Sequence, residues 1–378
     1  DIIQQAKTEI DAVYFLARND RITLSALALL RDARRRGVPN VRLIVDANFQ
    51  HIPKAVLAHI REEGVQVKVY HPLTLRHPGW LFSRMHEKVV VADGKRYVTG
   101  GRNLAEAYFA LAKRNFVDRD VYVDGASAAE AQRYFENLWT SENVAELHVH
   151  VPAVARRSAS CILDAALHDL EREHFIALDM GTDWSAGRRD AGPVQFLHDR
   201  GGENRGEVGA EIADIIDGAK RSIVIESPYL VPSKSLLELL EKKSAEGVYI
   251  LIVTNSFRST DGVLPYAGYI KYRRRVLRAG IDIAEFKGPD TLHAKTMVID
   301  GRTVLIGSYN LDPRSQNLNT EVMCVARDAA IAGEVLDSIA GHVADSWRAG
   351  RRGESPPHER SFSVWALRLL LPVFENQL

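Results

Sequence analysis

The sequence has few cysteines, no net charge and no long apolar run, and each absence excludes a class of protein. Two cysteines, Cys161 and Cys324, lie far apart among 378 residues, which excludes a disulfide framework and a cysteine metal site. Lys plus Arg equals Asp plus Glu, at 49 each, so the chain lacks the positive field typical of a nonspecific nucleic-acid binder. No apolar run reaches the length of a membrane span.

Length and composition are those of a folded protein. A chain of 378 residues, 46% apolar and 26% charged, favours two globular domains with sizeable cores. The sequence begins at Asp1, without a Met or a signal peptide, and we expect that the natural N-terminus has been removed.

An internal repeat organises the chain. The segment His86-Glu87-Lys88, four residues, Asp93-Gly94 and then Gly100-Gly101-Arg102-Asn103 returns as His293-Ala294-Lys295, four residues, Asp300-Gly301 and then Gly307-Ser308-Tyr309-Asn310. Upstream of each copy, a helical run that ends in Gly precedes an apolar strand. The pattern predicts two similar α/β domains, each with helices on both faces of a sheet.

The repeat also predicts how the chain divides. The first domain is expected over 1–150 and the second over 206–350. A linker helix and a Gly- and Asp-rich loop fill 151–205, and an apolar tail forms 351–378.

The spacing within each copy points to chemistry. Alternate side chains of a strand share a face, so His86 and Lys88 point the same way, as do His293 and Lys295. Asp-Gly is a strong two-residue hairpin signal. Such a loop sets His86 opposite Gly101 and His293 opposite Ser308, which brings Asn103 and Asn310 beside the histidines. Each hairpin then offers an imidazole, an ammonium and an amide, which is half of a phosphate cradle.

A phosphodiester reaction needs cationic and amide donors, a nucleophile, and an acid for the leaving oxygen. Two half-sites acting on one phosphate supply these groups. An attacking histidine also needs a carboxylate that keeps its other ring nitrogen protonated. Asp120 and Glu321, which follow their motifs at similar distances and precede apolar strands, are the predicted partners.

The doubled pattern resembles the HKD motif of the phospholipase D superfamily, and further strings resemble its bacterial cardiolipin synthase branch. These strings include Ser227-Pro228-Tyr229-Leu230-Val231-Pro232, Thr254-Asn255-Ser256, Leu311-Asp312-Pro313-Arg314-Ser315 and Leu318-Asn319-Thr320-Glu321. The resemblance implies two phospholipase D-like domains related by pseudo-twofold symmetry, with mixed sheets flanked by helices. Glu87 departs from the Asn that is common between His and Lys.

The resemblance also implies roles. His86 attacks phosphorus, and His293 acts first as an acid and then as a base. Lys88, Lys295, Asn103 and Asn310 bind the phosphate, Asp93 and Asp300 are structural, and no metal or cofactor is needed. The implied function is transfer of a phosphatidyl group between phospholipid headgroups through a phosphohistidine. Hydrolytic phospholipase D is the first alternative, a nuclease or phosphodiesterase the second, and a noncatalytic lipid-binding module the third.

Other features favour ordinary structural interpretations. His148 and His150 lack the further ligands of a metal site. The basic cluster Lys271 to Arg278 is typical of a solvated helix face. The apolar loop 73–82 and the apolar run 362–374 suit either core packing or contact with a bilayer surface. The resemblance implies a monomer with an internal pseudo-dimer, bound peripherally to the bacterial inner membrane. Its expected substrate is phosphatidylglycerol or phosphatidylethanolamine, and nucleic acid is disfavoured.

Overall fold

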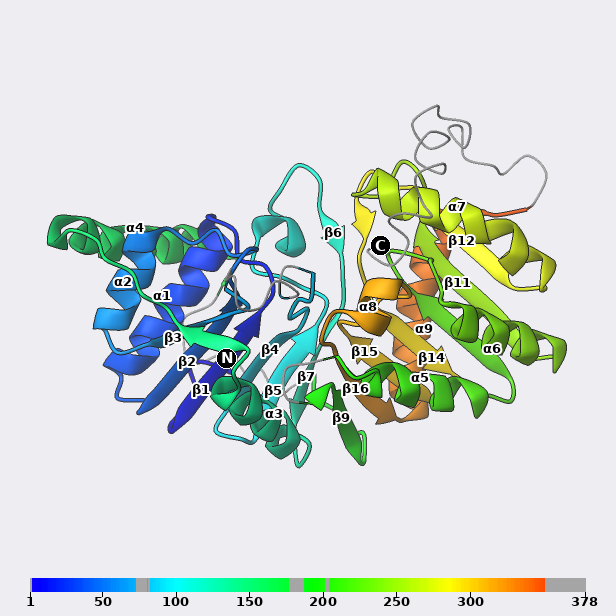
Figure 1. Ribbon diagram of the computed structural model, residues 1–378, viewed down its shortest axis with the longest axis horizontal. Helices are drawn as coiled ribbons and strands as arrows, with labels where there is room; N and C mark the ends of the chain where they lie inside the picture. The colour runs from blue at the N-terminus through cyan, green and yellow to red at the C-terminus, as the bar shows by residue number, and fades with distance from the viewer. Residues whose placement is uncertain (1, 73–79, 81, 177–186, 201–203, 351–378) are drawn as a thin grey trace. The chain divides into compact units, whose positions relative to one another are not determined.

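The computed structural model describes residues 2–72, 80, 82–176, 187–200 and 204–350. Two compact units form (Figure 1). The first comprises Asp1–Val98, Arg102–Ala112 and Tyr122–Asp190, and the second comprises Thr99–Gly101, Lys113–Val121 and Ala191–Leu378. The second unit therefore includes two short segments from the first half of the sequence.

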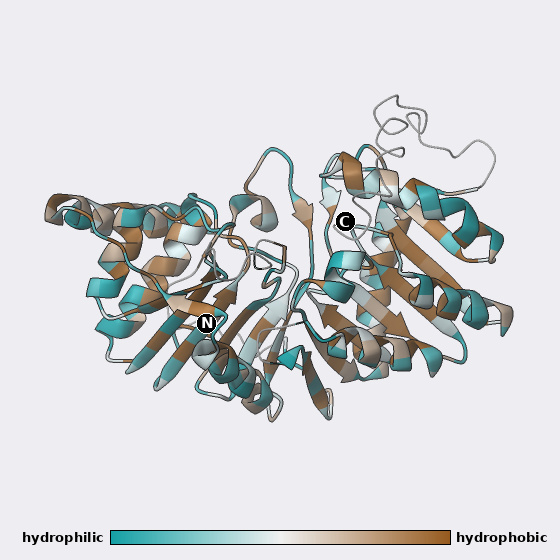
Figure 2. Cartoon of the chain, in the orientation of Figure 1, coloured by the Kyte–Doolittle hydropathy of each residue, from teal (hydrophilic) through white to brown (hydrophobic). Residues whose placement is uncertain are grey.

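The first sheet is mixed and has seven strands in the order β7-β5-β4-β1-β2-β3-β8. The strands are β1 Glu9–Tyr14, β2 Asn40–Asp46, β3 Gln66–Tyr70, β4 Lys88–Ala92, β5 Arg96–Gly100, β7 Asp120–Asp124 and β8 Val144–Glu146. Strands β1, β2 and β3 are parallel, whereas β4 runs antiparallel to β1. Strand β4 is an apolar run over Val89 to Ala92, as expected of a strand covered on both faces, whereas β1 and β2 also carry charged residues such as Asp11 and Arg42. Hydrophobic residues are frequent in the strands of both units (Figure 2).

Four helices flank this sheet. They are α1 Arg21–Arg35, α2 Lys54–Glu62, α3 Ala128–Thr140 and α4 Ala153–Arg172. Helices α1, α2 and α4 pack with Ile10 and Ala12 of β1 in one core. Helix α3 faces the alternate side chain, Asp11, through Gln132 and so covers the other face. Helix α4, which lies in the predicted linker, packs against α1 and α2 in the first unit.

The second sheet has eight strands in the order β17-β12-β11-β10-β14-β15-β16-β9. The strands are β9 Val194–His198, β10 Ser222–Glu226, β11 Tyr249–Asn255, β12 Asp282–Phe286, β14 Thr296–Ile299, β15 Thr303–Gly307, β16 Val322–Arg327 and β17 Ser346–Arg348. The order β12-β11-β10-β14-β15-β16 repeats the order β3-β2-β1-β4-β5-β7 of the first sheet. The predicted fold class, two similar α/β halves with mixed sheets, is confirmed. Strand β9 lies at one edge, although its residues fall in the predicted linker.

Helices cover both faces of the second sheet. They are α5 Glu207–Asp217, α6 Lys234–Ala245, α7 Val263–Arg278 and α9 Ala329–Ala344, and the short α8 Pro313–Asn317 follows the second motif. Helices α5, α6 and α7 share one core, and α9 packs in another on the opposite face. Side-chain caps fix several starts: Ser233 accepts a hydrogen bond from Leu236 N, and Asp328 accepts one from Ile331 N.

The apolar segments suggested for membrane contact fall mostly beyond the described residues. The run 362–374 lies outside them entirely, and only Trp80 and Phe82 of the loop 73–82 are described. Trp80 stacks on His71 with ring centroids 4.5 Å apart, and Phe82 is 43% exposed. Within the described ranges, no helix has both the length and the apolar composition that are needed to cross a bilayer.

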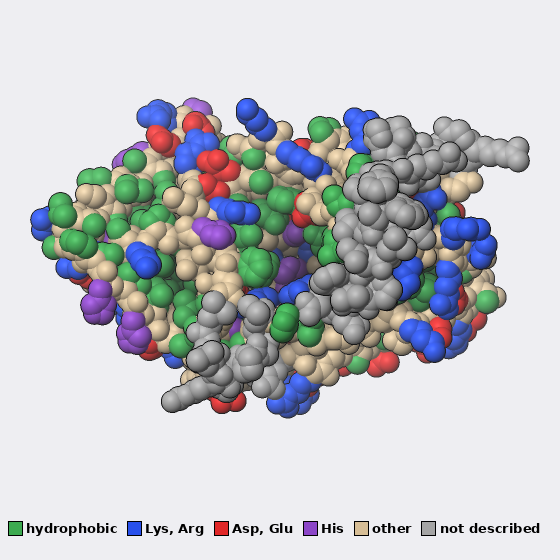
Figure 3. Space-filling model, turned by 45° about the horizontal axis from the view of Figure 1, so that its top comes forward, with side chains coloured by type: hydrophobic (Ala, Val, Ile, Leu, Met, Phe, Trp, Pro, Cys, Tyr) green, Lys and Arg blue, Asp and Glu red, His purple; other side chains and the backbone are tan. Residues whose placement is uncertain are grey.

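Two arginines of the basic cluster of α7 form ion pairs. Arg275 forms a bidentate pair with Glu241 of α6, and Arg273 pairs with Glu285 of β12. Lysine and arginine side chains gather over this part of the second unit (Figure 3). The pairing agrees with the predicted solvated helix face.

Candidate active site

Each repeated motif forms a hairpin with a left-handed turn. Asp93 and Gly94 have φ of 55° and 60°, and Asp300 and Gly301 have 55° and 64°. Both turn residues need positive φ, which Asp and Gly tolerate best. The sequence therefore predicted the positions of these turns from the two Asp-Gly pairs, but not the length of the loop.

The motif aspartates, Asp93 and Asp300, accept hydrogen bonds from backbone N–H groups. The Asp93 carboxylate accepts hydrogen bonds from the N–H groups of Lys7, Thr8 and Glu9, at the start of β1. These bonds hold the pKa of Asp93 below its ordinary value, although burial opposes the shift. In this way the carboxylate joins the hairpin turn to the start of the first strand.

Asp300 makes the same contacts in the second unit. Its carboxylate accepts hydrogen bonds from the N–H groups of Lys220, Arg221 and Ser222, at the start of β10. Each turn is therefore tied to the first strand of its own sheet by the carboxylate that follows the motif lysine.

The register of the second hairpin differs from the prediction by one residue. Ile299 pairs with Thr303, and Gly307 N donates to Lys295 O at 3.3 Å. The prediction that Ser308 lies directly opposite His293 is therefore wrong. The returning strand contains one extra residue at the turn, Arg302, whose N–H donates to Ile299 O.

The second motif carries a buried histidine, lysine and carboxylate. His293 is 5% exposed, and its Nδ1 lies 2.5 Å from Asp118 Oδ2. The Lys295 Nζ lies 2.9 Å from His293 Nδ1 and 3.2 Å from Nε2, as alternate positions on a strand predict. The Phe116 ring packs edge-on against His293, 5.1 Å between centroids.

Asp118 reaches His293 because its segment joins the second unit. Strand β6, Phe116–Val117, pairs in parallel with β13, Thr291–Leu292, and His293 N donates to Val117 O at 2.7 Å. Next along the chain, Arg119 forms an ion pair with the buried Glu226 of β10. These contacts hold Asp118 directly beside the imidazole.

The electrostatics of this cluster favour a neutral His293. Burial and the positive charge of Lys295 lower the pKa of His293, against the effect of Asp118. Burial also lowers the pKa of Lys295 to about 8. Burial opposes ionisation of Asp118, but His293 and Lys295 outweigh it and hold that pKa below its ordinary value. With Asp118 ionised, Nδ1 carries the proton and Nε2 carries the lone pair.

The carboxylate that binds His293 is not one of the two predicted from the sequence, Asp120 and Glu321, whose histidines the sequence left open. The partner is Asp118, whereas Asp120 starts β7 and lies against Gly100. Backbone register makes Asp118 equivalent to Glu321: Gly101 N bonds to Arg119 O, and Ser308 N bonds to Val322 O. Asp118 directly precedes the accepting residue Arg119, as Glu321 directly precedes Val322.

The second predicted carboxylate, Glu321, is fully buried. Its Oε1 accepts a hydrogen bond from Ser315 Oγ at 2.6 Å, and its N–H donates to Asp199. Its negative charge acts on Lys295 and on Asp312. Burial, reinforced by that charge, raises the pKa of Asp312 to about 7. Sequence reasoning assigned no role to Asp312, although it lies in the Leu311-Asp312-Pro313-Arg314-Ser315 string and is the N-cap of α8.

The first motif has different neighbours. The Phe15 ring packs edge-on against His86, 5.1 Å between centroids, and also contacts the half-exposed Phe49 at 4.4 Å. Lys88 donates to His86 O and lies over the Phe15 ring. The unusual Glu87 is buried and accepts a hydrogen bond from Tyr134 Oη at 2.7 Å.

Both motif asparagines are buried where the hairpins end. Asn103 accepts a hydrogen bond from Leu16 N and donates one to Tyr108 Oη. Asn310 is 5% exposed, and its Oδ1 has no hydrogen-bond partner in the described part of the chain. The roles assigned to Asn103 and Asn310 as phosphate ligands stay predictions.

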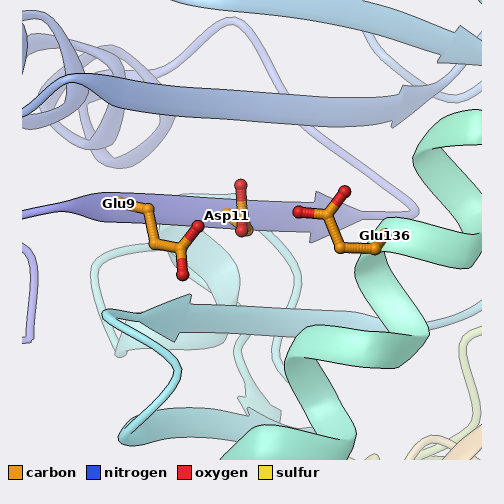
Figure 4. A group of neighbouring side chains, drawn as sticks. All are labelled: Glu9, Asp11 and Glu136. Atoms are coloured by element: carbon orange, nitrogen blue, oxygen red, sulfur yellow. The ribbon is translucent and has the colours of Figure 1, made fainter.

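Among the described residues, one carboxylate cluster has the spacing of a metal site: Glu9, Asp11 and Glu136 (Figure 4). The Arg42 guanidinium lies among these groups, 2.6 Å from Asp11 Oδ1 and 2.5 Å from Glu136 Oε1. An arginine that bridges β1 and α3 accounts for the cluster without an ion. His148 and His150 are exposed after β8.

Comparison with known proteins agrees with this geometry. The family model described as cardiolipin synthase, phospholipase D-like domain, matches residues 1–139 and 212–342, which include both motifs. The chain belongs to this family. It is accordingly an enzyme of the phospholipase D superfamily.

Individual relatives are more distant. The chain is 29% identical to cardiolipin synthase C of Escherichia coli over 383 residues, covering 88% of this chain and 79% of the relative. It is 26% identical to an uncharacterized protein of Helicobacter pylori, over 92% and 76% of the two chains. Among solved structures, phosphatidylserine synthase from Haemophilus influenzae matches with a TM-score of 0.73 at 16% identity, over 100% and 92%. That last similarity concerns the fold alone.

Proposed function

We propose that the protein is a phosphatidyltransferase of the cardiolipin synthase type, which moves a phosphatidyl group between alcohols through a phosphohistidine. Family membership and the similarity to cardiolipin synthase C support phospholipid chemistry. The observation that carries the proposal is the His293–Asp118 hydrogen bond beside Lys295. It gives a buried imidazole one defined tautomer and a neighbouring cation.

The proposed reaction has two displacements. In the first, a ring nitrogen of His86 attacks phosphorus, the bond to the leaving headgroup oxygen breaks, and protonated His293 gives that oxygen its proton. In the second, Nε2 of His293 takes the proton of the incoming alcohol, whose oxygen attacks phosphorus as the phosphorus–nitrogen bond breaks. The proton taken in the second step is the one delivered in the next cycle.

Asp118 and the lysines complete this scheme. Asp118 keeps the proton of His293 on Nδ1 and stabilises the imidazolium. Lys88, Lys295, Asn103 and Asn310 bind the phosphate oxygens, where ammonium and amide donors offset the charge that develops. No step requires a metal or an organic cofactor.

The proposal places the enzyme at a membrane surface. A diacyl donor cannot leave a bilayer readily, because each exposed methylene costs about 0.8 kcal/mol. Phe49, which contacts Phe15 beside His86, and the exposed Phe82 are apolar side chains suited to lipid contact. We propose peripheral binding to the bacterial inner membrane and phosphatidylglycerol or phosphatidylethanolamine as the donor.

Hydrolysis is the second candidate, because the same intermediate reacts with water when no alcohol is bound. Mass spectrometry of the products decides between the two, with phosphatidylglycerol or phosphatidylethanolamine in detergent micelles. Transfer predicts cardiolipin from phosphatidylglycerol, whereas hydrolysis predicts phosphatidic acid alone. Unchanged lipids in both incubations would contradict the proposed function.

A further inference from the structure

Two side chains outside the repeated motif form a pair near His293. Tyr229 lies between β10 and α6, and its hydroxyl donates to both carboxylate oxygens of Asp261 at 3.1 Å. Asp261 is exposed and directly precedes the start of α7. By strand register, Leu16 occupies the place of Tyr229 in the first half, since Ala17 and Leu230 form equivalent bridges with Leu104 and Leu311. The pair therefore belongs to one half alone.

One buried side chain fixes Tyr229 and His293 at the same end of the sheet. The Asn255 amide donates to Pro228 O at 3.1 Å and to Leu292 O at 2.7 Å, and it accepts a hydrogen bond from Leu292 N. Pro228 directly precedes Tyr229, and Leu292 directly precedes His293. The side chains of Tyr229 and His293 therefore extend from two neighbouring backbone segments that Asn255 holds together.

The loop that carries Asp261 is also held firmly. Arg114 donates to the carbonyl oxygens of Ser259 at 2.6 Å and Thr260 at 2.8 Å, and Ser259 Oγ donates to Phe286 O. Arg114 comes from the same segment as Asp118. Burial lowers the pKa of both His293 and Lys295, and the charge of Asp261 partly offsets each shift. Asp261 thus lies within electrostatic reach of the reacting groups.

We propose that Asp261 and Tyr229 bind the hydroxyl groups of a polyol headgroup, of the glycerol type, on the alcohol that accepts the phosphatidyl group. The inference rests on the proposed function and names its acceptor. A carboxylate accepts two hydrogen bonds from neighbouring hydroxyls, and the tyrosine oxygen accepts another. The remaining hydroxyl of the acceptor is the one that gives its proton to His293.

The neighbouring charges favour a neutral headgroup over a cationic one. Lys295 is buried beside His293, and Arg114 holds the backbone next to Asp261. A second ammonium, such as that of ethanolamine, would be repelled by these cations. A neutral polyol satisfies the carboxylate without adding positive charge.

The test separates acceptor binding from the first displacement. A phosphatidyl donor with a p-nitrophenol leaving group reports formation of the intermediate, while glycerol, 1-propanol and ethanolamine serve as acceptors. For Asp261→Asn and Tyr229→Phe we expect kcat/KM for glycerol to fall about tenfold, since a hydrogen bond to a charged group is lost. Initial p-nitrophenol release and transfer to 1-propanol should stay within about twofold of the original enzyme.

A matched pair elsewhere in the unit provides the control. Tyr249 donates to Asp282 at 3.2 Å, at the starts of β11 and β12, the opposite end of the sheet from His293. Asp282→Asn should leave kcat/KM unchanged for all three acceptors. Equal losses with glycerol and 1-propanol, a selective loss with ethanolamine, or no loss at all would overturn the subsite. Absence of p-nitrophenol release by the unmodified enzyme would instead contradict the proposed function.

Discussion

The two hairpins share a backbone but are supported by different buried groups. Strand register makes Asp46 equivalent to Asn255, because Val13 and Glu226, which face the equivalent motif residues Val89 and Thr296, pair with Ile44 and Val253. The repeated motif likewise makes Arg84 equivalent to Thr291. In the first half a buried carboxylate lies 3.6 Å from a buried guanidinium, whereas the second half has the neutral side chains of Asn255 and Thr291.

A similar difference follows the motif asparagines. Asp312, with its buried carboxyl, occupies the place that Ala105 has in the first half. The groups proposed to bind phosphate are repeated, but the residues that support them are not. The proposed reaction uses both imidazoles and both ammonium groups, whereas the buried side chains around them differ between the halves. The comparison predicts that equivalent substitutions have unequal effects.

The largest effect is expected at Asp118. Asn at this position cannot keep the proton on His293 Nδ1, and turnover should fall by about 10³-fold, as in other carboxylate–histidine pairs. Steady-state kinetics of Asp118→Asn and Asp120→Asn, with circular dichroism to verify folding, make the comparison. The loss should be at least ten times larger for Asp118. A larger loss for Asp120→Asn would restore the sequence-based choice of carboxylate.

The next effect concerns the buried ion pair. Arg84→Ala leaves the Asp46 carboxylate buried without its guanidinium and should destabilise the first unit by about 3 kcal/mol. The equivalent Thr291→Val should cost the second unit about 1 kcal/mol or less. Hydrogen exchange in β2 and β11 measures both local free energies. Equal changes in the local free energies of the two strands would show that the Asp46–Arg84 pair and Thr291 contribute equally to stability.

The smallest effect depends on pH. Asp312 has a folded pKa of about 7, above its ordinary value, so its contribution to stability is complete below about pH 4 and is lost as pH rises through 7. Asn keeps the cap on Ser315 N but cannot ionise. The stability of Asp312→Asn relative to the original protein should therefore increase by about 2–3 kcal/mol between pH 5 and pH 8. Urea unfolding at both pH values measures this, and a pH-independent difference would contradict it.

The sequence was sufficient for features that depend on short-range spacing. Two Asp-Gly turns, the shared face of His293 and Lys295, and the repeated order of strands and helices all follow from local periods. The choice between Asp118 and Asp120 did not, because residues two apart lie on the same face of a strand. The segment between the hairpin and that strand is also four residues longer in the first half, counting Gly101 to Arg119 against Ser308 to Val322.

Other parts of the candidate site depend on contacts between distant segments. Nothing local predicts that 113–121 joins the second unit, or that Arg114 holds the loop before Asp261. The third loop residue, Lys95 in the first hairpin and Arg302 in the second, was likewise not predicted, since Asp-Gly is typical of two-residue loops. Tertiary packing decides these features, and periodicity within one segment does not encode them.

The central claim, that phosphatidyl transfer proceeds through His86 with His293 as acid and base, can be tested by trapping the intermediate. His293→Ala is incubated with a phosphatidyl donor that carries a label in its phosphatidyl part and p-nitrophenol as the leaving group. This leaving group needs no acid, so the first displacement proceeds and the second stalls. The account predicts acid-labile label on the peptide that contains His86, and retention of configuration at phosphorus in the unmodified enzyme. Inversion at phosphorus, or label absent from His86, would contradict it.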